Sequence, residues 1–267
     1  MDKITVNRPL ANTFGWLGVN GTVIDAPART KEVSLSLREG EERTVVLEDA
    51  EAVRVSAEVG RNAVLRLVQV RRGGEGAIND VRAECGENAR FEWYRVVLGG
   101  SEIYDNCSVT LREEGAAFLA EYGYRLGGAE RLDVNCEVIH LGKKTRSDIR
   151  SAGVLRDHAF KLFRGTIDLR KGCSGSEGNE TEDVLLMDET VRNQSIPVIL
   201  CGEEDVIGNH GATIGRLDEE LVYYLSSRGM TREQVYDLMA RARLDAVIAK
   251  IPDEKTRQEL LGTEESA

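Results

Sequence analysis

One histidine stands out as a group that could do chemistry. His210 lies in the run VIGNHGATIG, in which no residue carries a formal charge. A neutral imidazole is a good ligand for iron, and Gly211 beside it leaves room for a metal ion or a second subunit to approach closely. An isolated histidine is also commonly a hydrogen-bonded structural residue. The residue type alone therefore leaves a metal ligand and a structural residue as two interpretations of His210.

The five cysteines are spaced for packing rather than for a preformed metal cluster. They are odd in number, lie far apart and include no Cys-x-x-Cys pair, which favours reduced thiols over disulfides or a four-cysteine site. Cys201 ends the apolar run SIPVILC, where a cysteine commonly packs as a small apolar residue, and Cys173 lies in a Gly-Ser turn. We therefore expect both residues to pack structurally, Cys201 at the end of a strand and Cys173 within a flexible loop.

The charge balance argues against two classes of partner. The chain of 267 residues has 35 Lys and Arg against 46 Asp and Glu, a formal net charge of -11, and no basic run. A phosphate-binding surface needs clustered cations, so nucleic acid and anionic membranes are unsuitable partners. The N-terminus lacks the features of a secretory signal, and no stretch approaches the ~20 apolar residues of a membrane span. We expect a soluble, cytoplasmic protein.

The sequence pattern over most of the first two thirds of the chain predicts short strands. From about Glu32 onward, apolar and polar residues alternate, which predicts strands with one buried face. Three glycine turns precede similar segments and place Leu65, Phe91 and Phe118 about 26 to 27 residues apart. A period of that size is typical of a stacked solenoid, in which no single coil buries its own apolar face. Meandering hairpins of a β-sandwich would give the same weak repeat, so the pattern leaves both architectures open.

After Gly215 the pattern changes from strands to helices. A first helix is expected over Leu217–Ser227, because the segment begins with acidic residues and is followed by a likely C′ glycine, Gly229. Thr231 and Gln234 form a capping box for a second helix, and a third helix follows. The second helix has a first apolar face formed by Val235, Leu238, Met239 and Ala242. A second stripe on a shifted face continues to Pro252 and consists of Leu244, Val247, Ile248 and Ile251. The chain therefore divides into a lead-in at 1–30, a β body at 31–216 and a helical segment at 217–267.

Several short motifs, in order along the chain, resemble those of one protein family. They are SEGNETED, SIPVILC and NHGATIG, followed by DEEL, YYL and SRG, and they cover roughly residues 160–240. This set is similar to the core domain of SufB and SufD, the paired scaffold subunits of the SUF iron–sulfur cluster assembly system. The resemblance implies a mainly β fold, a right-handed parallel β-helix over residues 31–216 with a C-terminal helical segment. It also implies that residues 217–267 dock SufC, an ABC-type ATPase.

The resemblance assigns roles to single residues. His210 matches a SufD motif whose histidine is implicated in cluster assembly at the interface with SufB, which makes it the candidate metal ligand. Glu182 lies where SufB carries the cysteine thought to accept sulfur, and a carboxylate cannot take up persulfide sulfur because that transfer needs a thiolate. The chain therefore resembles SufD more than SufB. His210, Glu182 and Cys201 are the candidate cofactor-binding residues, and a solvated acidic turn is the alternative for Glu182.

The function implied by the resemblance is that of a non-catalytic scaffold. It would pair with SufB or with a second copy of itself, dock SufC and hold iron or an iron–sulfur cluster transiently at a subunit interface, with no tightly bound cofactor. The sequence contains no GxSxG elbow, P-loop lysine motif or Rossmann fingerprint, so ATP chemistry must come from a partner. The alternatives are a β-helical enzyme, such as a lyase or an acyltransferase, and a pure protein-interaction module. The low aromatic content of 5% and the absence of a hexapeptide repeat argue against the enzyme.

Overall fold

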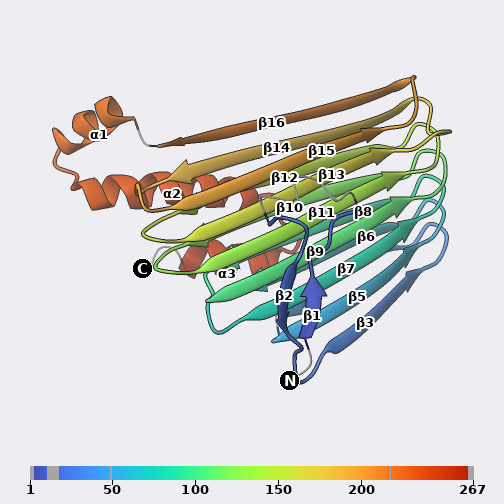
Figure 1. Cartoon of the computed structure of the whole chain (residues 1–267), viewed down its shortest axis with the longest axis horizontal. Helices are drawn as coiled ribbons and strands as arrows, with labels where there is room; N and C mark the ends of the chain where they lie inside the picture. The colour runs from blue at the N-terminus through green and yellow to red at the C-terminus, as the bar shows by residue number, and fades with distance from the viewer. Residues whose placement is uncertain (1–2, 11–17, 49, 217, 264–267) are drawn as a thin grey trace.

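The computed structural model describes residues 3–10, 18–48, 50–216 and 218–263, and its body consists of two seven-stranded sheets (Figure 1). Successive strands alternate between the sheets, so each coil of the chain contributes one strand to each of them. All neighbouring strands in both sheets are parallel. The body is therefore a parallel β-solenoid, which confirms the predicted β-helix and excludes the sandwich alternative.

Each sheet follows the chain order of its strands. The first sheet runs β16-β14-β12-β10-β8-β6-β4, and the second runs β15-β13-β11-β9-β7-β5-β3. The strands of the first sheet are β4 (Glu42–Glu48), β6 (Val64–Arg71), β8 (Arg90–Leu98), β10 (Ala117–Leu126), β12 (Arg146–Leu155), β14 (Ser176–Leu186) and β16 (Val206–Arg216). The strands of the second sheet are β3 (Lys31–Leu37), β5 (Ala52–Val59), β7 (Ala77–Cys85), β9 (Glu102–Leu111), β11 (Arg131–His140), β13 (Phe160–Leu169) and β15 (Arg192–Cys201).

The coil of the solenoid lengthens along its axis. Val45 lies beside Leu67, 22 residues later, whereas Gly178 lies beside Gly208, 30 residues later. The strands grow accordingly from 7 residues in β4 to 11 residues in β16, and Figure 1 shows the resulting taper. Because the period drifts, the repeat is visible in the sequence only for the middle coils.

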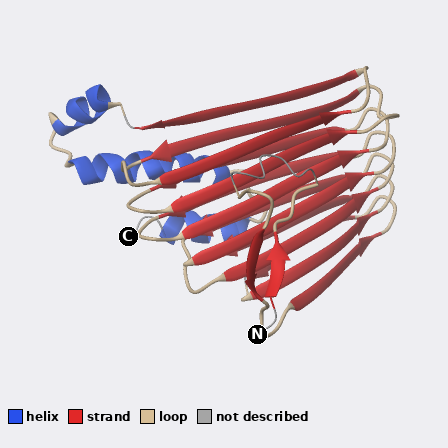
Figure 2. Ribbon diagram, in the orientation of Figure 1, coloured by secondary structure: helices blue, strands red, loops and turns tan. Residues whose placement is uncertain are grey.

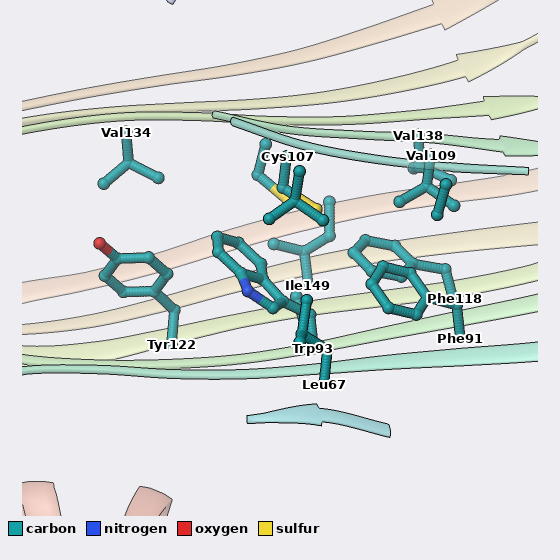
Figure 3. Close-up of a cluster of buried hydrophobic side chains, with 14 of the residues drawn as sticks. Leu67, Phe91, Trp93, Cys107, Val109, Phe118, Tyr122, Val134, Val138 and Ile149 are labelled. Atoms are coloured by element: carbon teal, nitrogen blue, oxygen red, sulfur yellow. The ribbon is translucent and has the colours of Figure 1, made fainter. Parts of the chain in front are cut away.

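The interior of the middle coils is a stack of apolar side chains. Leu65, Phe91 and Phe118 are register partners in three neighbouring strands, which confirms the spacing seen in the sequence. The rings of Phe91 and Phe118 stack with centroids 5.7 Å apart (Figure 3). Each of these residues covers the same position of the coil before it, and so the stack buries apolar surface that one coil alone would leave in water.

The interior also contains polar groups that are paired with one another. Arg95 Nε donates to Asp105 Oδ2 at 2.8 Å from the opposite sheet, and both side chains are fully buried. Tyr122 Oη donates to the same Asp105 carboxylate. One coil earlier, Gln69 Oε1 accepts a hydrogen bond from Trp93 Nε1 at 2.8 Å. Because an unpaired buried charge is costly, these pairs restrict which residues can face each other across the interior.

Three helices follow the last strand (Figure 2): α1 (Glu219–Ser226), α2 (Arg232–Ile248) and α3 (Glu254–Thr263). The Thr231 side chain accepts from Gln234 N, and the Gln234 side chain accepts from Thr231 N, which confirms the capping box. Met230 N donates to Leu225 O, and Gly229 has a φ of +96°, so α1 ends in a Schellman motif. Within the part of the chain that the structure describes, no helix is both long and apolar enough to cross a membrane.

Helix α2 packs on the outer face of the first sheet, against β10 and β12. A Cβ atom at Gly123 of β10 would lie 3.1 Å from Val247 Cγ1, so the glycine lets the helix approach the strand closely. The predicted apolar face is wrong at Leu238 and Ala242, which are exposed. The second predicted stripe is confirmed, because Leu244, Val247 and Ile248 are buried, and Val235 of the first stripe is buried as well.

The N-terminal residues cover part of the outer face of the second sheet. They include an antiparallel pair of strands, β1 (Lys3–Val6) and β2 (Thr22–Asp25). Asn7 Nδ2 and Thr22 Oγ1 donate to the carboxylate of Asp133 at 2.8 and 2.7 Å, and Asp133 forms a buried ion pair with Arg164. In the sequence, the obvious apolar anchor of this segment is Gly15-Trp16-Leu17, which lies outside the described residues. The segment ahead of the solenoid is thus attached to it through buried polar groups.

Replacing Arg95 with methionine should strongly destabilise the fold, because it leaves Asp105 as an uncompensated charge in the interior. We expect the free energy of unfolding to fall by about 3–5 kcal/mol, the usual result of removing one partner of a buried ion pair. Arg112→Met is the matched control, since its pair with Glu84 lies on the surface with side chains 53% and 50% exposed. Urea unfolding monitored by circular dichroism measures both variants, and equal losses would contradict the prediction.

Candidate functional site

The solenoid ends at β15 and β16, each of which has a neighbouring strand on one side only. Apart from Arg192 and Arg216 at their ends, these two strands contain no charged residue. At the opposite end, β3 and β4 each carry acidic and basic residues. Charged side chains are a common protection of exposed sheet edges against association. The end formed by β15 and β16, which we call the open end, therefore presents main-chain hydrogen-bonding groups without that protection.

His210 lies on the interior side of the open end. In β14, Val184 belongs to the buried core, and the alternation along a strand places Glu182 and Glu180 on the same side. His210 is the register partner of Glu180 in the neighbouring strand, so its side chain lies on the inner face as well. It is exposed because β16 is the last strand of its sheet. The structure thus exposes an imidazole at the open end of the solenoid.

Glu182 is buried one coil below the open end, so its interpretation as a solvated turn residue is wrong. Its side chain is 2% exposed and contacts Lys161 Nζ, which belongs to a fully buried side chain of the opposite sheet. Burial lowers the pKa of Lys161 well below its usual value. Burial also raises the pKa of Glu180 to about 7, and the nearby Lys161 acts in the other direction. A buried group of titratable side chains therefore lies beside the exposed imidazole, one strand further into the solenoid.

Sequence reasoning missed Lys161 and Glu180. In β13, Lys161 has the same parity as the core residues Phe163 and Ile167, so a lysine on the inner face of an apolar strand was the available signal. Glu180 is accommodated by a glycine, because a Cβ atom at Gly165 would lie 2.2 Å from Glu180 Oε2. That contact joins residues of two different sheets, and no pattern of neighbouring residues in the sequence predicts it.

Cys201 is exposed, which contradicts the expectation that it packs in the core. Its register partner is the core residue Leu169, but β15 is an edge strand and leaves the side chain uncovered. Its Sγ donates to the main-chain oxygen of Glu203 at 3.1 Å. Cys173 lies in the turn between β13 and β14 and is fully buried, which confirms its structural packing, and burial raises the pKa of its thiol. The other four cysteines are buried, so Cys201 is the exposed thiol.

The structure brings His210 and Glu182 together but leaves Cys201 apart from them. Glu182 is the register partner of Ala212, two residues from His210 on the same inner face. Cys201 precedes the turn into β16, and the four residues from Val206 to His210 move the imidazole about 13 Å along the strand. Among the described residues, no group of three or more His, Cys, Asp and Glu side chains could hold a metal ion. His210 and Glu182 could therefore contribute to an iron site only with other ligands.

A second histidine is structural. His140 is fully buried in β11, where Nδ1 lies 2.7 Å from Thr145 Oγ1 and Nε2 lies 2.9 Å from Ser147 Oγ. Burial lowers the pKa of His140 to about 4, so its imidazole is neutral at physiological pH. His158 is exposed in the turn between β12 and β13. Neither residue lies on the two strands of the open end.

Fold and site together define a class of protein: a parallel β-solenoid that presents an imidazole at an uncharged open end and carries helices on one outer face. The family model for the SUF system FeS cluster assembly SufBD core domain matches residues 26–243. The chain therefore belongs to the SufBD core domain family. This finding agrees with the resemblance seen in the motifs around His210.

Curated relatives carry the same family name. The iron–sulfur cluster assembly protein SufD of Bacillus subtilis is 26% identical over 184 residues, which are 69% of this chain and 42% of that protein. SufB of the same organism is 25% identical over 173 residues, 65% of this chain and 37% of that protein. A SufBD family protein of Mycobacterium tuberculosis is 28% identical over 173 residues, 65% of this chain and 20% of that protein. The chain thus spans less than half the length of these relatives.

In the native protein, one thiol should react much faster than the other four. We expect iodoacetamide to label Cys201 first, because the remaining cysteines are buried and only an accessible thiolate reacts. Mass spectrometry of native and urea-unfolded protein should show one and five labelled thiols, respectively. Cys201→Ser should remove the fast site and Cys173→Ser should keep it. Equally fast labelling of Cys173 in the native protein would contradict the burial described above.

Proposed function

We propose that this chain is a non-catalytic, SufD-like scaffold subunit of SUF iron–sulfur cluster assembly, acting in the cytoplasm. The observation that carries the proposal is the exposed imidazole of His210 at an end of the solenoid that lacks protecting charges. Iron and the nascent cluster are substrates that pass through this site, and imidazole suits iron as a ligand. The family match over residues 26–243 favours this function over a β-helical lyase or acyltransferase and over a pure interaction module.

The carboxylate at Glu182 supports a role like that of SufD. Persulfide sulfur needs a thiolate, and Glu182 cannot supply one. The exposed thiol, Cys201, lies near the start of β16, about 13 Å along the strand direction from His210. The identities of 26% to SufD and 25% to SufB do not choose between the two subunits, so the proposal of a SufD-like role relies on the carboxylate at this position. Sulfur would therefore arrive on a partner chain.

The partner would be SufB or a second copy of this chain, joined through β15 and β16. Both strands have free edges to which another strand can add main-chain hydrogen bonds. Ile207 and Ile214 of β16 are 54% and 44% exposed, so the same pairing would also bury apolar surface. Such an interface would enclose His210 between two chains and exclude water from the iron that it binds.

The SufC ATPase would dock on the helical segment. Tyr223 of α1 is 78% exposed, Tyr224 is 51% exposed and Leu238 of α2 is 47% exposed. Aromatic side chains of this kind are enriched at the centres of protein interfaces. The opposite side of α2 is already packed on the solenoid, so movement of the bound ATPase would be transmitted to the strands.

Replacing His210 with alanine should abolish cluster assembly in cells that depend on this chain. Within the described part of the chain the exposed His210 side chain forms no hydrogen bond or ion pair, so the variant should fold with an unchanged melting temperature. His158→Ala is the matched control, because that histidine is also exposed but lies in a turn away from the open end. Growth on conditions that demand iron–sulfur enzymes measures the effect. Equal growth of both variants would remove the assigned role of His210.

The double substitution Tyr223→Ala and Leu238→Ala should weaken binding to SufC by at least about tenfold, as expected for removal of interface anchors. Val46→Ala is the control, since Val46 is 43% exposed in β4 at the opposite end of the solenoid. Co-purification followed by titration of the purified ATPase measures both. Unchanged binding by the double variant would contradict docking through α1 and α2.

A further inference from the structure

A groove of about 950 Å³ lies between helix α2 and the outer face of the first sheet. Its lining comes from the ends of β8, β10 and β12, from the residue that follows β14 and from the loop between α1 and α2 (Figure 1). We call it the α2 groove, and its apolar side chains include Leu98, Val154, Met187, Met230 and Leu238. The proposed function uses only Leu238 of this set.

The groove follows from the way in which α2 packs. The helix contributes to two separate apolar clusters, one that contains Leu244 and borders Leu98, and one that contains Ala240 and Val154. Because Leu98, Ala240 and Val154 all line the groove, it lies along the seam between the two clusters. Protein interiors are normally packed without voids much larger than a water molecule. An open volume of this size beside two packed clusters is therefore suited to a ligand.

The apolar part of the groove is aliphatic. Leucine, valine, alanine and methionine side chains line it, and no aromatic ring is found among the lining residues that the structure describes. A planar ring system would have no ring to stack on, whereas leucine and methionine side chains adapt to a flexible chain. Met187 is buried and Leu238 is 47% exposed, so the aliphatic surface continues from the floor of the groove to its rim.

Four arginines line the same groove from two sides. Arg125 and Arg156 belong to the ends of the strands, and Arg228 and Arg241 belong to the helical segment. Arg125 is the register partner of Val154, so a guanidinium stands beside an apolar residue on the outer face of the sheet. In a chain with a formal net charge of -11, four arginines around one groove are a local concentration of positive charge.

The arginines differ in what they already contact. Arg156 forms an ion pair with Glu233 of α2. The guanidinium of Arg228 lies over the ring of Tyr224, 4.6 Å from its centroid, and a contact of this kind does not use the N–H donors. The N–H donors of Arg228 are therefore available to an anion that enters the groove.

Two acidic residues line the groove and do not cancel its positive charge. Both carboxylate oxygens of Glu130 accept hydrogen bonds from main-chain N–H groups of the turns, at 2.8 and 2.9 Å. Asp237 is exposed on α2. Arg241 pairs within the helix with Asp245, at 3.6 Å between Nε and Oδ2. Because arginines outnumber carboxylates in the lining, an anion fits the groove better than a cation does.

We propose that the α2 groove binds an aliphatic carboxylate, a molecule with an unbranched hydrocarbon body and one anionic head. The head lies among the arginines, since a guanidinium binds a carboxylate through two parallel hydrogen bonds. The body lies on the aliphatic side chains, where its apolar surface leaves water. The volume of about 950 Å³ is within the usual range for small-molecule sites. This site goes beyond the proposed function and does not depend on it.

Calorimetric titration of the purified full chain with decanoate tests the site. The wild-type chain should bind one decanoate with a dissociation constant in the micromolar range. Acetate lacks the hydrocarbon body and decyltrimethylammonium carries the opposite charge, so each should bind at least about tenfold more weakly than decanoate. The two probes thus separate the contribution of the chain from that of the charge. Equal affinity for decanoate and decyltrimethylammonium would overturn the proposal.

Replacing Arg228 with methionine removes one charge from the groove and keeps an unbranched side chain. Arg228→Met should therefore bind decanoate at least about tenfold more weakly than the wild type. Arg61→Met is the matched control, since Arg61 is 55% exposed, pairs with Glu87 and lies in the turn between β5 and β6, away from the groove. Its affinity for decanoate should stay within about twofold of the wild type.

A second variant keeps the test valid if Arg228→Met fails to fold. Leu238→Asp places a carboxylate at an exposed position of α2, so it should fold and should repel the anionic head, with decanoate binding at least about tenfold weaker. Circular dichroism melting curves verify the fold of each variant. Absence of saturable decanoate binding by the wild type, or equal affinity in the wild type and both groove variants, would overturn the proposal.

The experiment also separates the groove from the surface proposed for SufC. Tyr223 is not among the residues that line the groove, so Tyr223→Ala should keep its decanoate affinity within about twofold. Loss of SufC binding by Arg228→Met, together with no decanoate binding by the wild type, would assign the groove to the protein interface and overturn the ligand site. Decanoate binding that Arg228→Met weakens would support the ligand site even where SufC binding is unaltered.

Discussion

Each inward side chain of the solenoid must fit the side chains at the same position one coil earlier and one coil later, because neighbouring strands are parallel and in register. The stacked rings of Phe91 and Phe118 satisfy this requirement with apolar contact. Arg95 and Asp105 satisfy it with a buried ion pair across the two sheets. No coil is stable alone, since its apolar face is buried only by its neighbours. Everything else in the molecule depends on this repeated fit.

The lengthening of the coil changes what the interior can hold. Near the open end the strands reach 11 residues, and the inner face accommodates large polar side chains that the first coils do not carry. Glycines provide the space: a Cβ atom at Gly153 would lie 2.4 Å from the Tyr124 ring, and one at Gly165 would lie 2.2 Å from Glu180. The wide end is therefore built around polar groups, and the narrow end around apolar ones.

Termination of the stack is what makes His210 available. Had another coil followed β16, its strands would have covered the imidazole, as the later coils cover His140. The same termination leaves two uncharged strand edges beside it. The exposed imidazole of His210 and the unpaired strand edges therefore have the same structural cause. This fits a protein whose chemistry takes place between chains. The outer faces are occupied by the N-terminal strands on one sheet and by α2 on the other.

Features that depend on a few neighbouring residues could be predicted from the sequence. Alternation predicted the strands, and the capping box at Thr231 and the glycine at Gly229 delimited the helices, because each arises from hydrogen bonds or backbone angles within one turn. The motif around His210 identified the family. The tertiary structure alone decided that Cys201 is exposed and that Glu182 is buried against Lys161. Those outcomes depend on contacts between strands distant in sequence and on where the stack of coils stops, and no local pattern encodes either one.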